Sequence, residues 1–263
     1  METNNMEINK ILVVGDKYSE YATGKKALTI SQLELLAKLP DNLFPGEHEL
    51  IVGQGVCKHK AKKVIDDIGN NQRLKRKLKT CSVEKLASEH KNRHTHKWDE
   101  RNILIGQAEK VDHKLNMYAL PLVIDDNCEL MGDHQTGQHV QGMLLVEACR
   151  QALIAVTEEF VYQKQSDKYY VINSMSIDFA NFLFPLPAIV HFEFVEKDVN
   201  ERRGRFKARM SVMQNQTVCA SMDVSFAVYS AKSILVKEGE LAESATEAVV
   251  SPSDHFNMEQ DCA

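Results

Sequence analysis

The sequence predicts an α+β protein in which an antiparallel sheet curls around one long helix. Three observations predict this fold. Two of them concern residues 102–229, where six segments have strand character and a single stretch has the character of a long buried helix. The third concerns the first 85 residues, where short strand and helix signals alternate. This succession of elements is typical of one large sheet with a helix packed on it, preceded by a smaller α/β unit.

The long helix is expected over about 140–163, which at about 1.5 Å per residue makes it roughly 35 Å long. Apolar side chains lie nearly all round it, so other elements must wrap it on most sides. The strand segments are 103–107, 115–123, 169–183, 188–198, 203–214 and 217–229. One long buried helix inside long antiparallel strands is the layout of the hotdog fold, which we expect over 102–232.

The first 85 residues predict a small α/β module. Ile11–Val14 has the pattern of a short buried strand, and a helix is expected from Ile30 until Pro40. Glu49–Val52 repeats the strand signal, and the next helix should end at Gly69. The glycines that follow this second strand do not form a G-x-G-x-x-G pattern, so we interpret them as tight strand-to-helix turns and not as a nucleotide site.

The composition is that of an ordinary globular protein, with 263 residues of which 43% are apolar. Whole-chain disorder, collagen and a coiled-coil rod are therefore excluded. No run of about 18 apolar residues is present, so no segment is expected to span a membrane as a helix, and the polar, acidic start does not resemble a signal peptide. Six scattered cysteines without a C-x-x-C pair indicate reduced thiols in the cytoplasm. Neither a cofactor nor a metal ion is predicted.

Charge is unevenly distributed along the chain, whose formal net charge is −5. Residues 58–79 contain nine Lys and Arg residues, whereas the chain from Glu238 onward has seven acids and no Lys or Arg. We therefore predict a disordered acidic tail over 239–263. The chain before Glu238 has 32 basic and 30 acidic residues. The basic stretch is either a docking surface for an anionic partner or a solvated helix face; the net charge argues weakly against a dedicated nucleic-acid binder.

Residues 86–101 predict a polar linker, or a loop that leads into the hotdog unit. Three histidines in this region, His90, His94 and His96, suggest a comparison with zinc sites. No second group of ligands with suitable spacing lies near them, so a solvated loop is the preferred interpretation.

Two charged residues, Glu147 and Arg150, interrupt the apolar helix. Burying either without a partner would be costly, and their spacing puts them on one face together with Gln151. In a catalytic interpretation, Glu147 or a histidine is the general base and Arg150 orients the carboxylate or holds an anion. The alternative is a buried ion pair that only fixes the register of the helix.

The loop that leads into this helix supplies further candidates. His134 and His139 are the candidate proton carriers, and His139 is expected toward the same side of the helix as Glu147. Gly142, followed by Met143, would let a substrate carbonyl approach backbone N–H groups at the positive end of the helix dipole. Gly142, Met143 and Gln151 are accordingly the expected substrate-binding residues. Three aromatic residues are either the lining of an acyl tunnel or ordinary sheet core: Phe179, Phe182 and Phe184.

The string D-H…Q-H-V-x-G-M-L-L-x-E-A-x-R-Q over 133–151, with His96-Lys97 upstream of Asn102–Ile105, resembles the A-factor biosynthesis hotdog family. The resemblance covers roughly 94–230. It implies transfer of a β-ketoacyl group from acyl carrier protein to the hydroxyl of dihydroxyacetone phosphate, on the way to γ-butyrolactone signals. The best-known members carry two hotdog repeats, whereas this chain has one. We therefore expect a homodimer in which the partner completes each groove.

The same string is more distantly similar to β-hydroxyacyl-carrier-protein dehydratases. Glu147 matches their helix carboxylate, but counting back from Gly142 puts Asp133, and not His134, at the position of their catalytic histidine. Gln141 replaces the proline that precedes their glycine. Asp133 therefore joins the candidate catalytic residues.

Three functions are consistent with these observations. The first is an acyltransferase that uses acyl carrier protein or coenzyme A thioesters, with Glu147 as base or orienting group and Arg150 as anion holder. The second is a dehydratase or thioesterase on the same substrates. The third is a non-catalytic acyl-binding or regulatory protein.

Overall fold

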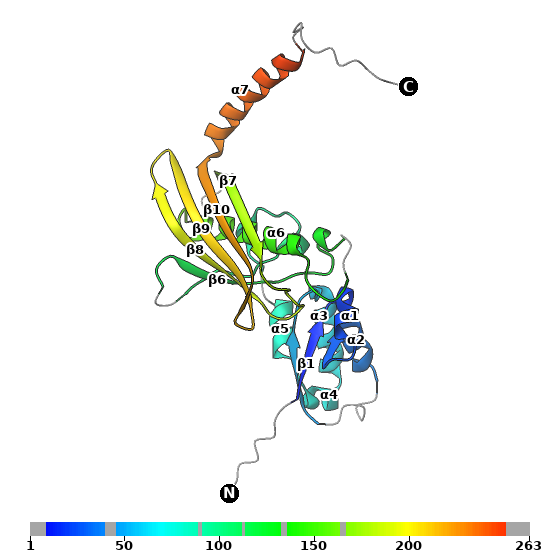
Figure 1. The fold of residues 1–263 in the computed structure, drawn as a ribbon. Coiled ribbons are helices and arrows are strands. Elements are labelled where there is room, and N and C mark those ends of the chain that lie inside the picture. Colours follow the sequence, from blue (N-terminus) through cyan, green and yellow to red (C-terminus); the bar gives the residue numbers. More distant parts are fainter. Residues whose placement is uncertain are drawn as a thin grey trace.

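The computed structural model describes residues 9–39, 46–88, 91–111, 114–132, 136–163 and 167–250. Within these ranges the chain forms a four-stranded parallel sheet near the N-terminus and a six-stranded antiparallel sheet that follows it (Figure 1). None of the helices in the described part combines the length and the apolar character needed to cross a bilayer.

The antiparallel sheet has the strand order β5-β6-β8-β9-β10-β7. Its strands are β5 (Glu109–Lys110), β6 (Met117–Pro121), β7 (Lys168–Phe179), β8 (Ile189–Val199), β9 (Arg203–Gln214) and β10 (Thr217–Ser230). Five of the predicted strand segments are thereby confirmed, because alternation of buried and exposed side chains along a strand is a signal that the sequence carries directly.

The remaining segment, 103–107, is not a strand, and that prediction is wrong. Only an isolated bridge joins Ile105 to Leu122 there. The backbone of Leu104 instead accepts a hydrogen bond from Val123 N at 2.8 Å and donates one to the side chain of Gln151 at 2.8 Å. Because the side chain of a helix residue takes this backbone donor, the segment is not available for a regular ladder.

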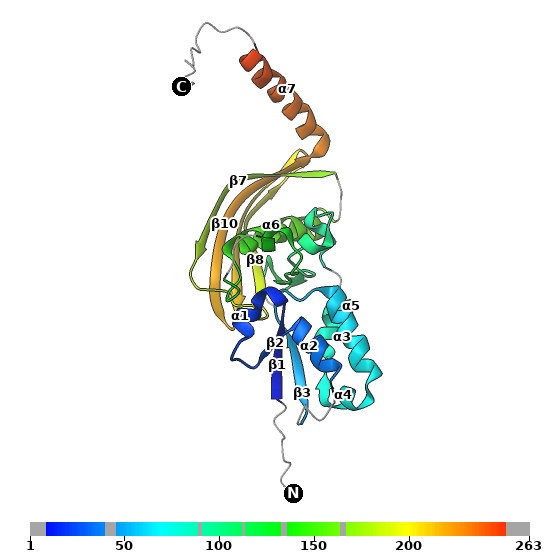
Figure 2. The ribbon, with the colours of Figure 1, turned by 90° about the vertical axis from the view of Figure 1, so that its right-hand side faces the viewer.

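The predicted long helix is α6 (Gly142–Phe160), and the antiparallel sheet curls around it (Figure 2). Its buried side chains come from every side of the helix, and they include the polar residues Gln151, Thr157 and Glu158. This helix and this sheet together are the hotdog fold, as predicted.

The N-terminal module is a parallel sheet of order β2-β1-β3-β4 with helices packed against it. Its elements are β1 (Asn9–Val14), η1 (Asp16–Tyr18), α1 (Ser19–Ala22), β2 (Ala27–Thr29), α2 (Ile30–Ala37), β3 (His48–Val52), α3 (Lys58–Asn70), α4 (Gln72–Lys77), β4 (Leu78–Lys79) and α5 (Cys81–Ser88). The predicted strands and helices are β1, α2, β3 and α3. A capping box of Thr29 and Gln32 starts α2, and α3 continues one residue past Gly69.

The glycines after β1 and β3 have a packing role at the junction between the module and the hotdog domain. A side chain at Gly53 would clash with the backbone of Pro185, and one at Gly15 would clash with Gly55 and with Asp126. Gly55 also has a φ of +80°, which favours glycine. These positions therefore form tight turns, and they also let the module approach the hotdog domain closely.

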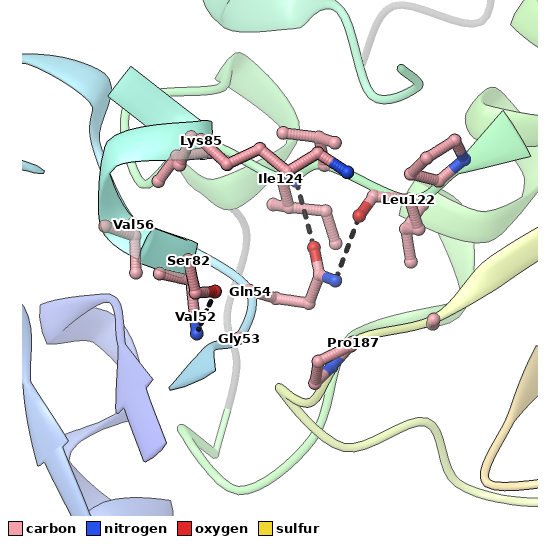
Figure 3. Close-up of a pocket in the computed structure, with 13 residues that line it drawn as sticks. Val52, Gly53, Gln54, Val56, Ser82, Lys85, Leu122, Ile124 and Pro187 are labelled. Carbon is pink, nitrogen blue, oxygen red and sulfur yellow. Dashed lines mark hydrogen bonds between the residues drawn. The ribbon is translucent and has the colours of Figure 1, made fainter. Parts of the chain in front are cut away.

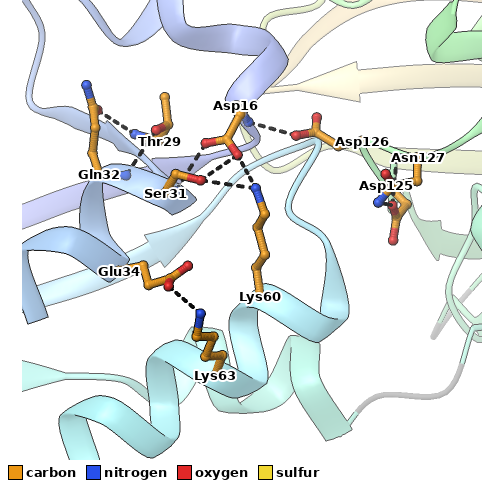
Figure 4. A network of polar contacts seen from close by, with 10 residues as sticks. All are labelled: Asp16, Thr29, Ser31, Gln32, Glu34, Lys60, Lys63, Asp125, Asp126 and Asn127. Atoms are coloured by element: carbon orange, nitrogen blue, oxygen red, sulfur yellow. Dashed lines mark hydrogen bonds and ion pairs between the residues drawn. The ribbon is translucent and has the colours of Figure 1, made fainter.

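A polar network joins the two parts at this junction (Figure 4). Asp126 of the hotdog domain accepts a hydrogen bond from the backbone N–H of Asp16 at 2.8 Å. The side chain of Asp16 accepts hydrogen bonds from the hydroxyl of Ser31 at 2.7 Å and from Lys60 at 2.5 Å. Lys60 thus forms an ion pair with Asp16, and Lys63 forms one with Glu34. Part of the basic stretch 58–79 therefore pairs with acids of the module itself.

Within the predicted linker 86–101, residues 86–88 end α5, and the segment 91–102 combines exposed side chains, such as Trp98, with buried ones, so it is not solvated throughout. Asn92 and Thr95 are fully buried, and two short 3₁₀ helices, η3 (Arg93–Thr95) and η4 (Glu100–Asn102), pack the segment against neighbouring elements. We call residues 91–104 the strap. A third 3₁₀ helix, η5 (Glu129–Gly132), lies farther along the chain.

The prediction of a disordered tail is also wrong for 239–250, because α7 (Ala231–Val250) is a continuous helix there. Ala and Glu, which are strong helix formers, each occur four times in the segment 231–250, and this segment contains no proline. The helix projects away from the rest of the chain (Figure 1), and none of its residues is buried. Residues 251–263 of the predicted tail lie outside the described residues.

Asp126 generates a prediction about stability and pH. Burial raises the pKa of Asp126 from 3.8 to about 6, so the protonated form is favoured in the folded state. The stability that this carboxyl contributes is complete below about pH 4 and is lost as the pH rises through about 6. We expect Asp126→Asn to raise the thermal unfolding midpoint at about pH 7.5 and to leave it nearly unchanged at about pH 4.

The measurement is circular dichroism during heating across this pH range, with Asp198→Asn as the control at an exposed position of β8. A shift of equal size at both pH values would contradict the prediction, because it would indicate altered packing and not altered ionisation.

Candidate active site

Glu147 lies on α6, inside the wrapped helix, and its carboxylate receives four hydrogen-bond donors. Arg150 donates from Nε to Oε2 at 2.7 Å and from Nη2 to Oε1 at 2.9 Å. Lys97 of the strap contacts Oε1 with its Nζ at 2.9 Å. The amide of Gln151 donates to the same oxygen at 3.0 Å. The predicted pair of Glu147 and Arg150 is therefore present. Lys97 is a second cation at the same carboxylate, and the sequence had not predicted this contact.

This set of donors controls the ionisation of Glu147. Burial raises the pKa of the carboxyl group, but hydrogen bonds from Arg150, Gln151 and Lys97 outweigh burial and lower the pKa to about 2. The side chain is consequently a carboxylate at any physiological pH. With two cations on one carboxylate, the group has an excess positive charge.

Gln151 fixes the strap to the helix. Its side chain is fully buried; it accepts from the backbone N–H of Leu104 at 2.8 Å and donates to the carbonyl of Asn102 at 2.8 Å. Gln151 also donates to Glu147, so both the oxygen and the nitrogen of its side-chain amide have partners within the protein. The structure thus gives this residue a positioning role beside the predicted substrate-binding role.

Glu158 holds the strap at a third point on the same face of α6. Its carboxylate contacts His94 Nδ1 at 3.2 Å and also contacts Nε2 of His96. Residues 147, 151 and 158 are spaced so that they share one helix face, and each of them binds the strap. The sequence did contain a signal for this arrangement: a second acid in an apolar helix, and a histidine pair followed by Lys97.

A pocket of about 200 Å³ opens beside Glu147. Its lining comes from the strap, from η5 and from the first turns of α6: Lys97, Asn102, Cys128, Glu129, Leu130, Met143, Val146 and Glu147. Met143, one of the expected substrate-binding residues, is largely exposed at this pocket. The candidate site is therefore this pocket with the cation pair of Lys97 and Arg150 next to it.

The other predicted site residues lie nearer the start of α6. His139 does not join Glu147: its ring packs on Phe182 at 4.8 Å between centroids, and its Nδ1 lies 3.5 Å from the hydroxyl of Thr136. Gly142 is the first residue of α6, and the ring of Phe179 occupies the space where a side chain would be. Asp133 and His134 lie outside the described residues.

Phe179, Phe182 and Phe184 are neither sheet core nor the wall of an enclosed tunnel in a single copy of the chain. All three are exposed, Phe182 to 68%. They surround the N-terminal end of α6 through the contacts of Phe179 with Gly142 and of Phe182 with His139. We call these three residues the aromatic patch.

A second cavity, of about 150 Å³, lies at the junction of the module with the hotdog domain (Figure 3). Gln54 spans it, accepting from Ile124 N at 3.0 Å and donating to the carbonyl of Leu122 at 3.0 Å. Among the described residues that line it, Lys85 is the only ionisable one. The described lining of this cavity is mostly apolar, and it contains no carboxylate, unlike the pocket beside Glu147.

No three His, Cys, Asp or Glu side chains within the described ranges gather closely enough to hold a metal ion. The group of His94, His96 and Glu158 is a set of hydrogen-bonded partners that fixes the strap.

Comparison with known proteins agrees with this fold. The model of the A-factor biosynthesis hotdog domain matches residues 79–230, a range that contains the strap, α6 and the whole antiparallel sheet. The chain belongs to this family. Membership supports a hotdog enzyme that acts on acyl thioesters.

No curated protein sequence matches the chain. Among solved structures, a conserved protein of Pseudomonas aeruginosa is 11% identical with a TM-score of 0.34, covering 46% of this chain and 86% of its own. A thioesterase of Haemophilus influenzae is 8% identical with a TM-score of 0.34, covering 48% and 79%. A putative thioesterase of Lactococcus lactis is 13% identical with a TM-score of 0.35, covering 48% and 92%. These likenesses are weak, and the assignment to the family rests on the match over 79–230.

The role of Gln151 can be tested by its removal. Gln151→Ala would leave the buried N–H of Leu104 and the carbonyl of Asn102 without partners, and we expect the free energy of unfolding to fall by roughly 3 kcal/mol. The exposed residue Gln138 provides the matched control, because Gln138→Ala should change stability by less than about 0.5 kcal/mol.

Denaturant unfolding measures both values, and hydrogen exchange at the amide of Leu104 reports the strap directly. A variant in which this amide exchanges as slowly as in the original chain would contradict the positioning role.

Proposed function

We propose that this chain transfers an acyl group from a thioester to a hydroxyl of a small phosphorylated acceptor, as in the formation of precursors of γ-butyrolactone signals. One observation carries the proposal: Lys97 and Arg150 share the carboxylate of Glu147 at the edge of a small pocket. Membership in the A-factor biosynthesis hotdog family supports the same reaction class.

The excess positive charge suits an anionic group on the substrate. Glu147 neutralises one of its two cations, so the cluster of Lys97, Arg150 and Glu147 keeps one positive charge that can attract a phosphate or an oxyanion, while Glu129 adds a negative charge elsewhere on the pocket lining. The planar guanidinium of Arg150 can bind two oxygens at once, whereas Lys97 acts as a point charge. A single carboxylate with a single cation would have no such surplus.

The size of the pocket favours a small acceptor. Its volume of about 200 Å³ is below the roughly 300–1,000 Å³ that is usual for sites of drug-sized ligands. A phosphorylated triose fits such a volume, whereas the complete acyl thioester does not. The acyl donor would therefore approach from outside the pocket, carried on acyl carrier protein or coenzyme A.

Glu147 is an orienting group in this proposal and not the general base. A carboxylate whose pKa is about 2 has little tendency to take a proton from a hydroxyl near neutral pH. Its function is to hold Arg150 and Lys97 in place. The proton carrier is then a histidine, His134 or His139.

In the reaction, the acceptor hydroxyl gives its proton to this histidine while its oxygen attacks the thioester carbonyl. The cation pair and the positive end of the α6 dipole stabilise the negative charge of the tetrahedral intermediate. Collapse of the intermediate breaks the C–S bond, and the leaving thiolate takes the proton from the histidine. The products are an ester and a free thiol.

A homodimer formed through β7 is part of the proposal. β7 is the edge strand of the antiparallel sheet and pairs only with β10 among the described strands. An unpaired edge of 12 residues is a ready template for another strand, and a second copy is the simplest partner. We also propose a cytoplasmic location, which the reduced cysteines expected from the sequence support.

Activity can be tested with a β-ketoacyl thioester and dihydroxyacetone phosphate, followed by mass spectrometry of the products and detection of free thiol. We expect ester formation, and about a 100-fold loss of turnover in Arg150→Ala and in Lys97→Ala, since each removes a charge at the reacting centre. The control is Arg101→Ala, since Arg101 pairs with Asp99 on the surface and should keep full activity.

Several results would contradict the proposal. A double variant Glu147→Ala, Arg150→Ala with full turnover would show that this site is not used. Release of free acid without ester would identify a thioesterase, and loss of water from β-hydroxyacyl thioesters would identify a dehydratase.

The dimer can be tested by sedimentation. Ile172→Lys places a charge on the exposed edge strand β7 and should convert a dimer into a monomer. Val195→Lys is the matched control, because Val195 is an exposed apolar residue of the interior strand β8. A chain that sediments as a monomer before substitution, or an unchanged dimer in Ile172→Lys, would refute pairing through β7.

A further inference from the structure

One apolar helix face has no partner among the described residues of a single copy. Along α7, apolar residues recur at helical spacing and form a stripe: Ile234, Leu235, Leu241, Ala242, Ala245, Ala248 and Val249. Leu235 and Leu241 are exposed to 71% and 60%. In proteins most of the stability of a helix comes from tertiary packing of its apolar face, and an amphipathic stripe usually packs on another surface. We call this face the α7 stripe.

The position of α7 determines which surface the stripe can reach. α7 follows β10 directly, and the last residue of β10, Ser230, pairs with Lys168 at the beginning of β7. Glu238, which interrupts the stripe in the second turn of α7, lies close enough to the hydroxyl of Tyr169 in β7 to raise the pKa of that hydroxyl. α7 therefore leaves the sheet beside the beginning of the edge strand, whereas β7 runs from there toward the module (Figure 1).

In an antiparallel pair of β7 strands, the beginning of one strand lies beside the end of the other. The end of β7 is Phe179, and the aromatic patch lies there. The α7 of one copy would thus arrive at the aromatic patch of the second copy. At about 1.5 Å per residue its 20 residues extend roughly 30 Å, enough to cross the patch.

Charges on the two surfaces are complementary. α7 has four acidic residues: Glu238 lies within the stripe, and Glu240, Glu243 and Glu247 lie on the other side of the helix. Next to the aromatic patch, Phe184 packs on Tyr21 at 5.8 Å between centroids, and Lys25 lies over the ring of Tyr21 at 4.9 Å. Lys25 and its neighbour Lys26 are exposed and can meet the acids of an incoming α7.

We propose that the α7 stripe docks on the aromatic patch of a second copy of this chain, and so covers the N-terminal end of that copy's α6. This inference rests on the dimer proposed above. The patch surrounds Gly142 and His139, so each copy would close the surroundings of the other copy's candidate site. Burial of apolar area on both sides provides the driving force.

The test is photo-crosslinking in the full chain, with p-benzoylphenylalanine in place of Leu241. Equal amounts of chain labelled with heavy nitrogen and of unlabelled chain are mixed before irradiation, so that mass spectrometry separates crosslinks between copies from crosslinks within one. We expect mixed-label crosslinks to peptides that contain residues 179–184 or 21–26. The same amino acid in place of Glu243, on the opposite side of α7, is the matched control and should give few.

A second variant examines the other surface. Phe182→Ala should lower the yield of these crosslinks about tenfold, as expected for the loss of one large apolar contact, whereas Val195→Ala should leave it unchanged. Both residues are exposed, so neither change should unfold the protein.

The outcomes distinguish this inference from the proposals on which it depends. A chain that sediments as a monomer refutes the dimer and this inference together, whatever its activity. A dimer whose crosslinks join two α7 helices, or stay within one copy, or are absent, overturns the docking of α7 alone. Acyl transfer is measured separately, and its absence leaves the crosslinking result interpretable.

Discussion

The ionised carboxylate of Glu147 inside a wrapped helix is the constraint on which the rest of the site depends. A buried charge without partners would destabilise the hotdog core, so donors must be brought to it. Arg150 comes from the same helix, but Lys97 must come from another part of the chain. The strap provides Lys97. Gln151 and Glu158, which both follow Glu147 along α6, hold the strap against the helix. The geometry of 91–104 is thus a consequence of one charge.

This arrangement also suggests that the orienting role and the proton-transfer role belong to different residues. Because its donors keep Glu147 ionised, the residue that looks most like a catalytic base is better suited to hold two cations at a fixed separation. Those cations belong to a helix and to a loop-like segment, so the positive surplus exists only when the strap is docked. In the proposed reaction, proton transfer is assigned to a histidine nearer the start of α6, close to the aromatic patch.

The sequence predicted those parts of the fold whose signals are local. Alternating side chains identify β7 to β10, and apolar coverage on all sides identifies α6, because each pattern reports its own burial. The strap could not be found this way: Asn92, Thr95 and His94 are polar, and Glu158, the partner of His94, lies 64 residues away on α6. The acidic composition of α7 indicated disorder for the same reason, since its stripe has no partner in its own copy. At the site, Glu147 and Arg150 were visible as charges in an apolar helix, whereas the residues around Lys97 did not indicate which helix residue it contacts.

The shared core has a consequence for how this protein is divided. Val14, Tyr18 and Ala22 of the module belong to the same buried cluster as Leu144 and Ala148 of α6, and the turn glycines let the two parts touch backbone to backbone. The family resemblance begins only at residue 79. The segment that is shared with relatives is therefore smaller than the cooperative unit that folds, and a chain cut at the boundary of the resemblance would expose part of its own hydrophobic core to water.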